Sequence, residues 1–232
     1  MKTIGLLGGM SWESTAAYYR AINTGVSRAR GGLHSAEIIL YSVDFAPIEA
    51  RQAAGDWTAT AEILTDAARR VQRAGADFLL ICTNTMHKVA PAIETAVTIP
   101  LLHIADATAE ALAKDGIKAV GLLGTAFTME QNFYKGRLTE RYGLKVLVPE
   151  KTARQSVHTI IYDELCRGKI LGASRQRYLD IVDDLARAGA EAVILGCTEI
   201  GLLIKPEDTA VKLYDTTAIH AARAVELALE GP

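Results

Sequence analysis

The sequence predicts an α/β protein of two homologous halves, each with a parallel sheet covered by helices. Three observations predict this fold class. Short apolar segments alternate with longer amphipathic ones, the apolar segments are continuous along the chain, and three stretches recur in the same order. Continuous apolar strands are typical of parallel sheets covered on both faces. Alternation of strands and helices indicates right-handed crossovers. We expect the two sheets to face each other across a central cleft.

Seven segments have the composition of buried strands. They are Thr3–Leu7, Glu37–Tyr41, Phe78–Ile81, Ala119–Leu123, Lys145–Val148, Ala192–Leu195 and Val211–Tyr214. The segments between them are longer and include predicted helices over Thr58–Arg73 and Arg175–Arg187. Apolar residues in the first of these helices recur every three to four positions, which makes one buried stripe.

The internal repeat sets the domain organisation. Three stretches recur at offsets of 109 to 116 residues: Lys2–Gly8 as Lys118–Gly124, Arg73–Asp77 as Arg187–Glu191, and Ile104–Thr108 as Leu213–Thr217. Their common order predicts two halves related by a pseudo-twofold axis. Residues 1–104 with 216–232 form the first half and carry Cys82, and residues 105–215 form the second half and carry Cys197.

Composition excludes several classes of function. The chain has 232 residues, half of them hydrophobic, and a formal net charge of −2. Nucleic-acid binding needs a cationic surface, so we expect none. The apolar runs are far shorter than the roughly 20 residues that span a bilayer. Three cysteines without a close pair do not form a disulfide framework. We therefore expect a cytoplasmic protein without membrane contact.

Two cysteines stand where chemistry is expected. Cys82 directly follows the strand Phe78–Ile81, and Cys197 follows the equivalent strand in the second half. Ligands of open α/β sheets bind beyond the carboxyl ends of the strands. Racemisation needs one deprotonated and one protonated acid–base group on opposite sides of a carbon. Thiols, with a pKa of about 8.5, suit both roles. Cys82 and Cys197 are therefore predicted to be catalytic.

Small polar residues follow both cysteines. Thr83, Asn84 and Thr85 come after Cys82, and Thr198 comes after Cys197. Their side chains and backbone N–H groups are expected to bind a substrate carboxylate and stabilise the carbanion, helped by the dipole of the helices that follow.

Less specific interpretations were weighed for the same residue types. A single cysteine at a strand end is usually a small buried hydrophobe, and Cys166, on a helical pattern, is predicted to be structural. The cysteine spacings contain no short chelating pair, so no metal is expected. His87 is one neighbour of Cys82 and not a cluster. The remaining histidines are scattered and are expected to have packing or surface roles; they are His34, His103, His158 and His220.

No organic cofactor is expected. Gly8-Gly9-Met10 lacks the full glycine spacing of a dinucleotide loop, and no phosphate loop ending in Gly-Lys-Ser/Thr is present. The two glycines are interpreted as allowing close approach of a small ligand. Lys88 is the candidate for a pyridoxal phosphate Schiff base, but nothing around it resembles a phosphate site.

Three motifs resemble the aspartate/glutamate racemase family: Gly5–Thr15, Cys82–Lys88 and Gly196–Ile200. The resemblance covers essentially the whole chain and is closest to the branch of aspartate/glutamate or broad specificity. It implies two pseudo-symmetric flavodoxin-like domains, no cofactor, a two-thiol mechanism and a homodimer. By analogy with glutamate racemases, it also implies that Cys82 deprotonates the D-enantiomer of an amino-acid substrate and Cys197 the L-enantiomer.

The resemblance also implies a set of substrate-binding residues. Those that match the family's pocket are Met10, Gln52, Thr83, Asn84, Thr85 and Thr198. Two departures concern specificity. Glu199 stands where glutamate racemases have histidine. Aspartate-specific relatives have basic residues near the positions of Gln52 and Glu164, which hold the second carboxylate of the substrate. Here those positions are a neutral and an acidic residue, with Arg51 and Asp163 adjacent. These departures leave room for neutral side chains.

Several alternatives stay open. Maleate isomerases and hydantoin racemases of the same superfamily also use paired cysteines, whereas decarboxylases that keep one cysteine fit less well. A two-lobed carboxylate-binding protein and an inactive paralogue would have the same fold.

Overall fold

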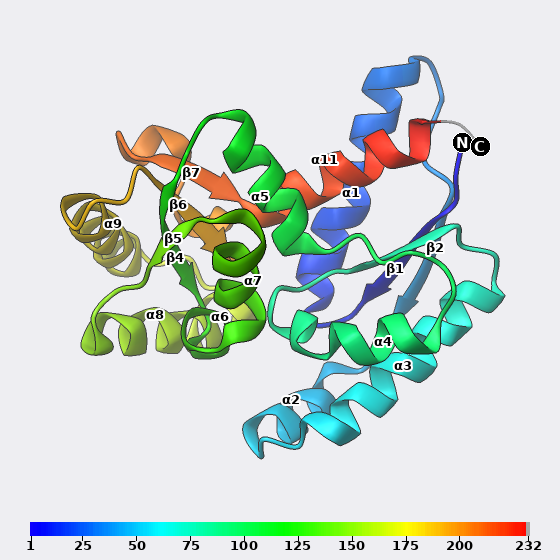
Figure 1. The fold of residues 1–232 in the computed structure, drawn as a ribbon, viewed down its shortest axis with the longest axis horizontal. Helices are drawn as coiled ribbons and strands as arrows, with labels where there is room; N and C mark the ends of the chain where they lie inside the picture. The colour runs from blue at the N-terminus through cyan, green and yellow to red at the C-terminus, as the bar shows by residue number, and fades with distance from the viewer. Residues whose placement is uncertain (231–232) are drawn as a thin grey trace. The chain divides into compact units, whose positions relative to one another are not determined.

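The computed structural model describes residues 1–230, and contacts within the chain divide it into two units (Figure 1). Unit 1 comprises Met1–Ile104 together with the segment that begins at His220, and unit 2 comprises Ala105–Ile219. All strand pairs in both units are parallel. The predicted α/β class with two parallel sheets is confirmed. The predicted border at residue 215 coincides with the beginning of helix α11 (Thr216–Leu229), whereas the contacts divide the chain a few residues inside that helix.

The sheet of unit 1 has the order β2-β1-β3. Its strands are β1 (Ile4–Gly8), β2 (Ile38–Ser42) and β3 (Phe78–Ile81). On the outer side of β3, Leu101 forms an isolated parallel bridge with Leu79. The segment around Leu101 therefore occupies a fourth position in the sheet.

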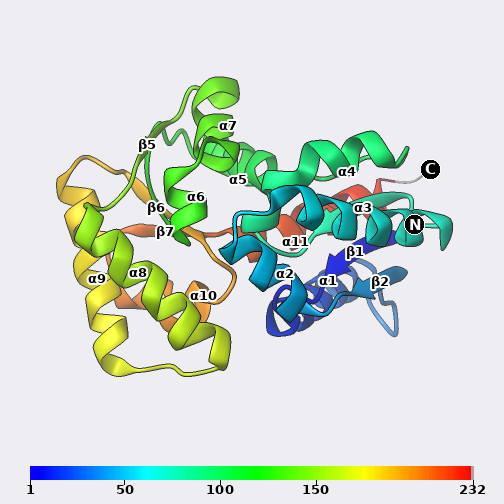
Figure 2. The same cartoon turned by 90° about the horizontal axis from the view of Figure 1, so that it is seen from below.

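Strands β1 and β3 are buried on both faces, as their continuous apolar character predicted, whereas the edge strand β2 is partly exposed. Helices α1 (Trp12–Arg30) and α11 cover one face, where the core includes Leu6, Tyr18, Ile22, Leu80 and Ala224. On the other face, α3 (Trp57–Arg73) and α4 (Ala90–Ala96) lie side by side, and the core includes Leu7, Leu64, Val71, Leu79 and Ile93 (Figure 2). Alternate side chains of a strand point to opposite faces, so neighbouring residues of β3 serve different cores.

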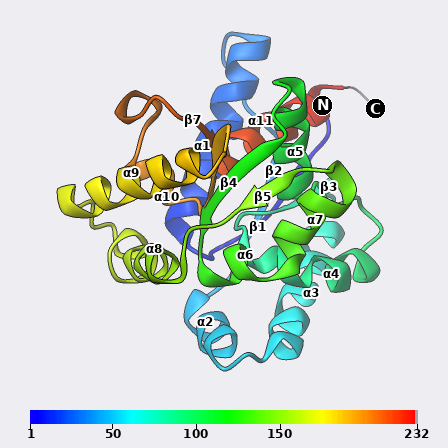
Figure 3. The same ribbon diagram turned by 60° about the vertical axis from the view of Figure 1, so that its left-hand side comes forward.

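Unit 2 repeats this topology with a sheet of order β5-β4-β6-β7 (Figure 3). The strands are β4 (Ala119–Gly124), β5 (Lys145–Leu147), β6 (Ala192–Gly196) and β7 (Lys212–Asp215). The position of β7 beside β6 corresponds to that of Leu101 beside β3. All seven predicted strands are present, each with its ends within one residue of the prediction.

Helices connect the strands of unit 2. They are α5 (Ile104–Lys114), α6 (Ala126–Glu130), α7 (Asn132–Tyr142), α8 (Lys151–Asp163), α9 (Gly172–Arg187) and α10 (Ile200–Leu203). Helix α5 follows the Leu101 segment, and α11 follows β7 in the same way. This correspondence is the structural counterpart of the third sequence repeat.

Short polar side chains begin three helices of unit 1. Ser11 accepts a hydrogen bond from the backbone of α1, Asp44 from that of α2 (Phe45–Ala53) and Asp56 from that of α3. Such caps satisfy backbone N–H groups that have no partner within the helix. Across residues 1–230, no helix combines the length and the apolar character needed to cross a membrane.

Candidate active site

Cys82 lies at the carboxyl edge of the unit 1 sheet, immediately after β3. Its backbone N–H donates to the carbonyl of Leu7 at 2.9 Å, so the chain direction of the strand continues through the cysteine. The side chain points toward the face covered by α1 and α11 and belongs to the apolar core there. Its exposed fraction is 0%. In this structure a ligand in solvent does not contact the Cys82 thiol.

The other predicted residues of unit 1 are also enclosed. Met10, Gln52, Asn84 and Thr85 are buried, and Thr83 is half-buried. Met10 follows β1 and lies in the core of the α3 face, whereas Gln52 lies on α2. Burial of a glutamine amide is costly unless it is hydrogen-bonded. Gln52 is therefore a buried helix residue and not a loop residue in contact with solvent.

The glycines at the end of β1 are required by packing within unit 1. Gly9 has φ +95°, and a Cβ there would overlap the backbone of Val43, just after β2. A Cβ at Gly8 would overlap Thr15 of α1. The loop therefore requires glycine because the protein's own backbone and side chains approach it closely. Close packing within unit 1 is thus sufficient to explain both glycines, and close approach of a ligand stays a prediction.

Cys197 occupies the equivalent place in unit 2, at the carboxyl end of β6. A Cβ at the preceding Gly196 would lie 2.8 Å from the carbonyl oxygen of Leu123, so the ends of β4 and β6 come together too closely for a side chain. The Cys197 thiol is half-buried and donates to Oε2 of Glu199 at 3.0 Å. Oγ1 of Thr198 donates to the same oxygen at 2.6 Å.

Both thiols are held in the protonated form in this structure. Burial raises the pKa of the Cys82 thiol far above its ordinary value. Burial also raises the pKa of the Cys197 thiol, and the nearby Glu199 carboxylate raises it further because a second negative charge is unfavourable there. The two sites thus differ: Cys82 lies among apolar groups, whereas Cys197 is hydrogen-bonded to a carboxylate.

Glu199 is the functional candidate that sequence reasoning missed. Its side chain is only 4% exposed and receives hydrogen bonds from both Cys197 and Thr198. A carboxylate directly after the Cys-Thr pair was the available signal, but it was interpreted only as a departure from glutamate racemases. Cys166, predicted to be structural, lies in a short 3₁₀ turn, Leu165–Arg167, instead of a helix interior. Burial and the charge of Glu199 raise the pKa of Cys166 to about 12.

The elements that directly follow the two cysteine loops are short. A 3₁₀ turn, Thr85–Val89, follows the Cys82 loop, and the four-residue α10 follows Cys197. The dipole of a helix grows with aligned peptide units, so these short elements add little to anion binding. At both loops the side chains and individual N–H groups are therefore stronger candidates for binding an anion than a helix dipole is.

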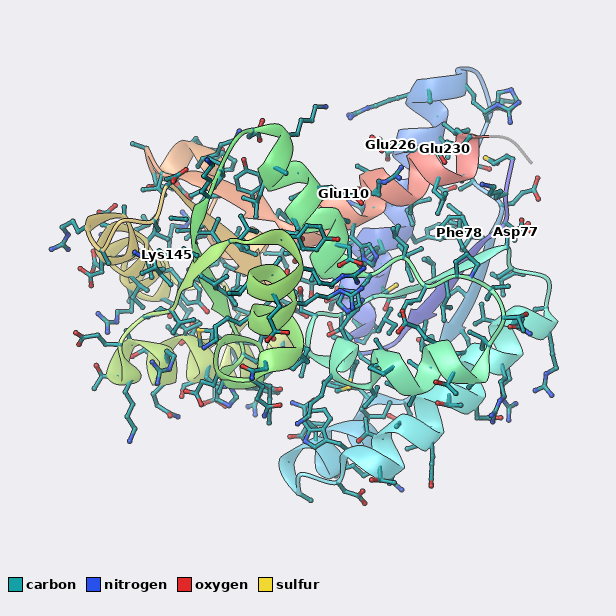
Figure 4. All side chains as sticks on the ribbon, viewed as in Figure 1. Asp77, Phe78, Glu110, Lys145, Glu226 and Glu230 are labelled. Atoms are coloured by element: carbon teal, nitrogen blue, oxygen red, sulfur yellow. The ribbon has the colours of Figure 1, made fainter. Side chains whose placement is uncertain are left out.

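A cavity of about 380 Å³ lies at the opposite, amino edge of the unit 1 sheet. Its lining includes Lys2, Asp77 and Phe78, and Figure 4 shows the last two at the beginning of β3. The Asp77 carboxylate accepts a hydrogen bond from the backbone of Thr3 at 2.6 Å, which fixes it to β1. This cavity is far along the strand from Cys82 and lacks the predicted residues. In the described part of the chain, no three histidine, cysteine or acidic side chains are grouped to hold a metal ion.

The predicted site residues thus form two sets, each at the carboxyl edge of one sheet. Unit 1 holds Cys82 with Met10, Gln52, Thr83, Asn84 and Thr85, and unit 2 holds Cys197 with Thr198. Glu199 joins the second set.

Comparison with known proteins adds independent information. Residues 7–224 match the Asp/Glu/hydantoin racemase family. A structure from Yersinia pestis, provisionally named an Asp/Glu racemase, shares 54% identity over 99% of this chain and 100% of its own, with a TM-score of 0.93. An aspartate racemase homologue from Pyrococcus horikoshii OT3 shares 36% identity over 99% and 100% of the two chains, with a TM-score of 0.84. The broad-specificity amino-acid racemase RacX of Bacillus subtilis (strain 168) is 22% identical over 96% of each chain.

Proposed function

The chain belongs to the Asp/Glu/hydantoin racemase family, and we propose that it is an amino-acid racemase that works without a cofactor, with Cys82 and Cys197 as its two acid–base groups. One observation carries the proposal. The two thiols stand at equivalent places in two units of the same topology. Each directly follows the third strand of its unit in chain order, β3 or β6, and each is followed by threonine. Packing alone does not require a cysteine at both places.

The proton transfer proceeds between the two thiols through the substrate. A thiolate removes the α-proton from one face of the amino acid, and the other thiol donates its proton to the opposite face. The first cysteine ends as a thiol and the second as a thiolate, so protons and charge balance. Reversal of the two roles converts the other enantiomer.

The substrate itself supplies the charge that forms the thiolate. Burial raises the pKa of both thiols, which disfavours a thiolate in the empty site. The α-ammonium group of a bound amino acid brings a positive charge close to the reacting carbon, and an opposite charge within a few ångströms lowers a thiol pKa. A substrate without that ammonium group would not activate the thiols in this way.

Glu199 assists Cys197 as its proton acceptor. The Cys197 thiol already donates to this carboxylate, so movement of the proton along the 3.0 Å hydrogen bond gives a thiolate and a neutral carboxylic acid. The pair carries one negative charge before and after the transfer. That balance matters in a buried site, where a second charge is costly.

Substrate orientation is assigned to the polar residues of the loops. Asn84 and Thr85 offer amide and hydroxyl donors for the α-carboxylate, and stabilisation there lowers the energy of the carbanion. The Thr198 hydroxyl donates to Glu199 and so holds that carboxylate in place beside Cys197. Met10 and Gln52 are assigned to the substrate side chain. An uncharged amide at residue 52 accepts neutral as well as acidic side chains, so we propose a range of substrates that includes aspartate, glutamate and homoserine.

The proposal is tested with cysteine variants and a matched control. Purified protein is incubated in D₂O with chelator and single-enantiomer amino acids, and proton NMR follows the loss of the α-proton while polarimetry follows inversion. We expect Cys82→Ser and Cys197→Ser each to abolish inversion, and Cys166→Ala to retain it. Inversion at the normal rate in either of the first two variants would disprove the two-thiol mechanism.

The complete burial of Cys82 favours one second candidate, a carboxylate-binding protein in which that thiol is only packing. Cys82→Ala separates the two functions, because it keeps a small apolar side chain at the site. A binding protein would keep its affinity and its thermal stability within a small margin. Absence of α-proton exchange for every amino acid in the wild-type protein would make this second candidate the better one.

A further inference from the structure

Three histidines far apart in the sequence gather in the core of unit 1. His87, His103 and His220 are all buried. The ring centroids of His87 and His103 are 4.4 Å apart, and those of His87 and His220 are 6.0 Å apart. The sequence indicated that His87 is one neighbour of Cys82 and not a cluster, and that His103 and His220 are scattered with packing or surface roles. Their gathering therefore calls for its own explanation.

Hydrogen bonds define the tautomer of His87. Its Nδ1 lies 2.8 Å from the carbonyl oxygen of Thr83, which can only accept, so Nδ1–H is the donor. Its Nε2 lies 3.2 Å from the backbone nitrogen of Ile104, which can only donate, so Nε2 accepts. A neutral ring with its proton on Nδ1 satisfies both bonds. A protonated ring would lose the bond from Ile104.

His220 has the opposite tautomer. Its Nε2 lies 2.8 Å from the carbonyl oxygen of Leu102 and donates to it, which leaves Nδ1 to accept from the Tyr18 hydroxyl at 2.8 Å. Burial lowers the pKa of His220 to about 4, so the ring is neutral near pH 7. Both rings thus use each nitrogen once, and both bond to the segment Leu102–Ile104.

These bonds lie where the chain passes between the units. The chain leaves unit 1 after Ile104 and returns to it at His220. His87 therefore binds Ile104, the first residue of α5, at the outgoing connection where the chain leaves unit 1. His220, where the chain returns to unit 1, binds Leu102 just before that point. The Thr83 carbonyl, one residue from Cys82, is bonded to the same cluster.

We propose that His87 is a positioning residue for proton transfer at Cys82. By holding the Thr83 carbonyl and the Ile104 N–H at once, the ring fixes the backbone of the Cys82–Asn84 loop relative to the outgoing connection. The inference rests on the proposed function, in which Cys82 exchanges the α-proton. Misplacement of a catalytic group by about 1 Å can lower a rate about a hundredfold, so the effect of losing this link is measurable.

Two variants that differ by one methylene test the link. In His87→Asn the amide reaches the Thr83 carbonyl but not Ile104, so the connection is broken. In His87→Gln the amide offers a donor and an acceptor at a longer reach and can make both bonds. Tyr18→Phe is the matched control, because it removes one buried hydrogen bond of the same histidine cluster and leaves the bonds of His87 to Thr83 and Ile104 in place.

Steady-state racemisation is measured from both enantiomers, and hydrogen-exchange mass spectrometry follows residues 82–86. We expect His87→Asn to lower kcat by about tenfold to a hundredfold with little change in KM, and to speed amide exchange in residues 82–86. His87→Gln should recover much of the rate. Tyr18→Phe should lose similar thermal stability and keep both the rate and the protection of the loop.

Two results overturn the inference. Equal kcat in His87→Asn and Tyr18→Phe at equal loss of stability would leave His87 a structural residue. Unchanged amide exchange in residues 82–86 of His87→Asn would show that the ring does not hold the loop. If the wild-type protein racemises no amino acid, the proposed function fails, and the exchange measurement still decides whether His87 fixes the Cys82 loop.

Discussion

Replacement of Glu199 by glutamine tests the least expected part of the proposed mechanism. The carboxylate is buried and accepts hydrogen bonds from the Cys197 thiol at 3.0 Å and from Thr198 at 2.6 Å. Glutamine keeps the shape and can accept one of these bonds, but it carries no charge and cannot take up the thiol proton. Removal of the charge should also lower the pKa of the Cys197 thiol, because Glu199 is among the causes that raise it.

The size of the effect follows from the two hydrogen bonds and the proton transfer. Hydrogen bonds to a charged group contribute about 1.5–3 kcal/mol each, and about 1.4 kcal/mol corresponds to a tenfold change in rate. Loss of a general base lowers a rate by about 10²–10⁴. The lower pKa of Cys197 offsets part of this loss. We therefore expect kcat for inversion to fall about a hundredfold in Glu199→Gln. Thermal stability should change little, because loss of the charged hydrogen bonds is offset by removal of the cost of burying a charge.

The assay separates inversion from exchange. Enantiomers have equal free energies, so kcat/KM for inversion must fall equally in both directions. Loss of the α-proton to D₂O without inversion can persist for the enantiomer that Cys82 deprotonates, and only for that one. Glu191→Gln, which alters an exposed carboxylate before β6, is the control. Inversion within about threefold of the wild-type rate in Glu199→Gln, well short of a general-base effect, would refute the role of Glu199.

Three further predictions address pH and backbone packing. First, because His220 is neutral when folded, with a pKa of about 4 against an ordinary 6.5, the unfolded chain takes up its proton first as the pH falls. The free energy of unfolding should fall by about 2 kcal/mol between pH 7 and pH 5. Urea unfolding of His220→Gln should show a weaker dependence of this free energy on pH, and an equal dependence would contradict the role of His220. Second, kcat for the enantiomer that Cys82 deprotonates should rise with pH above neutrality, because burial raises the pKa of the Cys82 thiol; a flat profile would mean that this thiolate is already formed. Third, Gly196→Ala should lower stability by about 1–3 kcal/mol and reduce activity, because its Cβ would lie 2.8 Å from a carbonyl of β4, while Gly172→Ala, where nothing lies within 4 Å, should be tolerated in the same thermal unfolding assay.

The fold was largely predictable from the sequence because its signals are local. A strand covered on both faces must be apolar at every position, so Phe78–Ile81 was identified with its observed bounds. The shift of the first strand from Thr3–Leu7 to Ile4–Gly8 reflects pairing of Gly8 with Ser42, which hydropathy does not encode. The repeat then indicated two sheets of the same topology, since each half must bury its own strands.

The candidate site was only partly predictable. The positions of Cys82 and Cys197 at strand ends followed from the strand assignments alone. The bond from Cys197 to Glu199 depends on the rotamers of two side chains, and composition does not determine these. The approach of His87 to His220 depends on two segments that are far apart in the sequence and meet only in the folded chain. No periodic pattern in the sequence indicates such a contact.

The division of the chain has a consequence for the order in which it folds during synthesis. Unit 2 is continuous in sequence, from Ala105 to Ile219, and can complete its sheet before the last helix leaves the ribosome. Unit 1 cannot, because Ala221, Ala224, Val225 and Ala228 of α11 belong to the core on one face of its sheet. Unit 1 is thus translated first but completes its fold after unit 2. Until α11 packs against it, the nascent chain exposes an apolar sheet face of the kind that chaperones bind. Ribosome-stalled chains that lack residues 216–230, and carry instead a flexible linker long enough to bring residue 215 out of the exit tunnel, should therefore be protected from proteolysis in unit 2 and cleaved in unit 1.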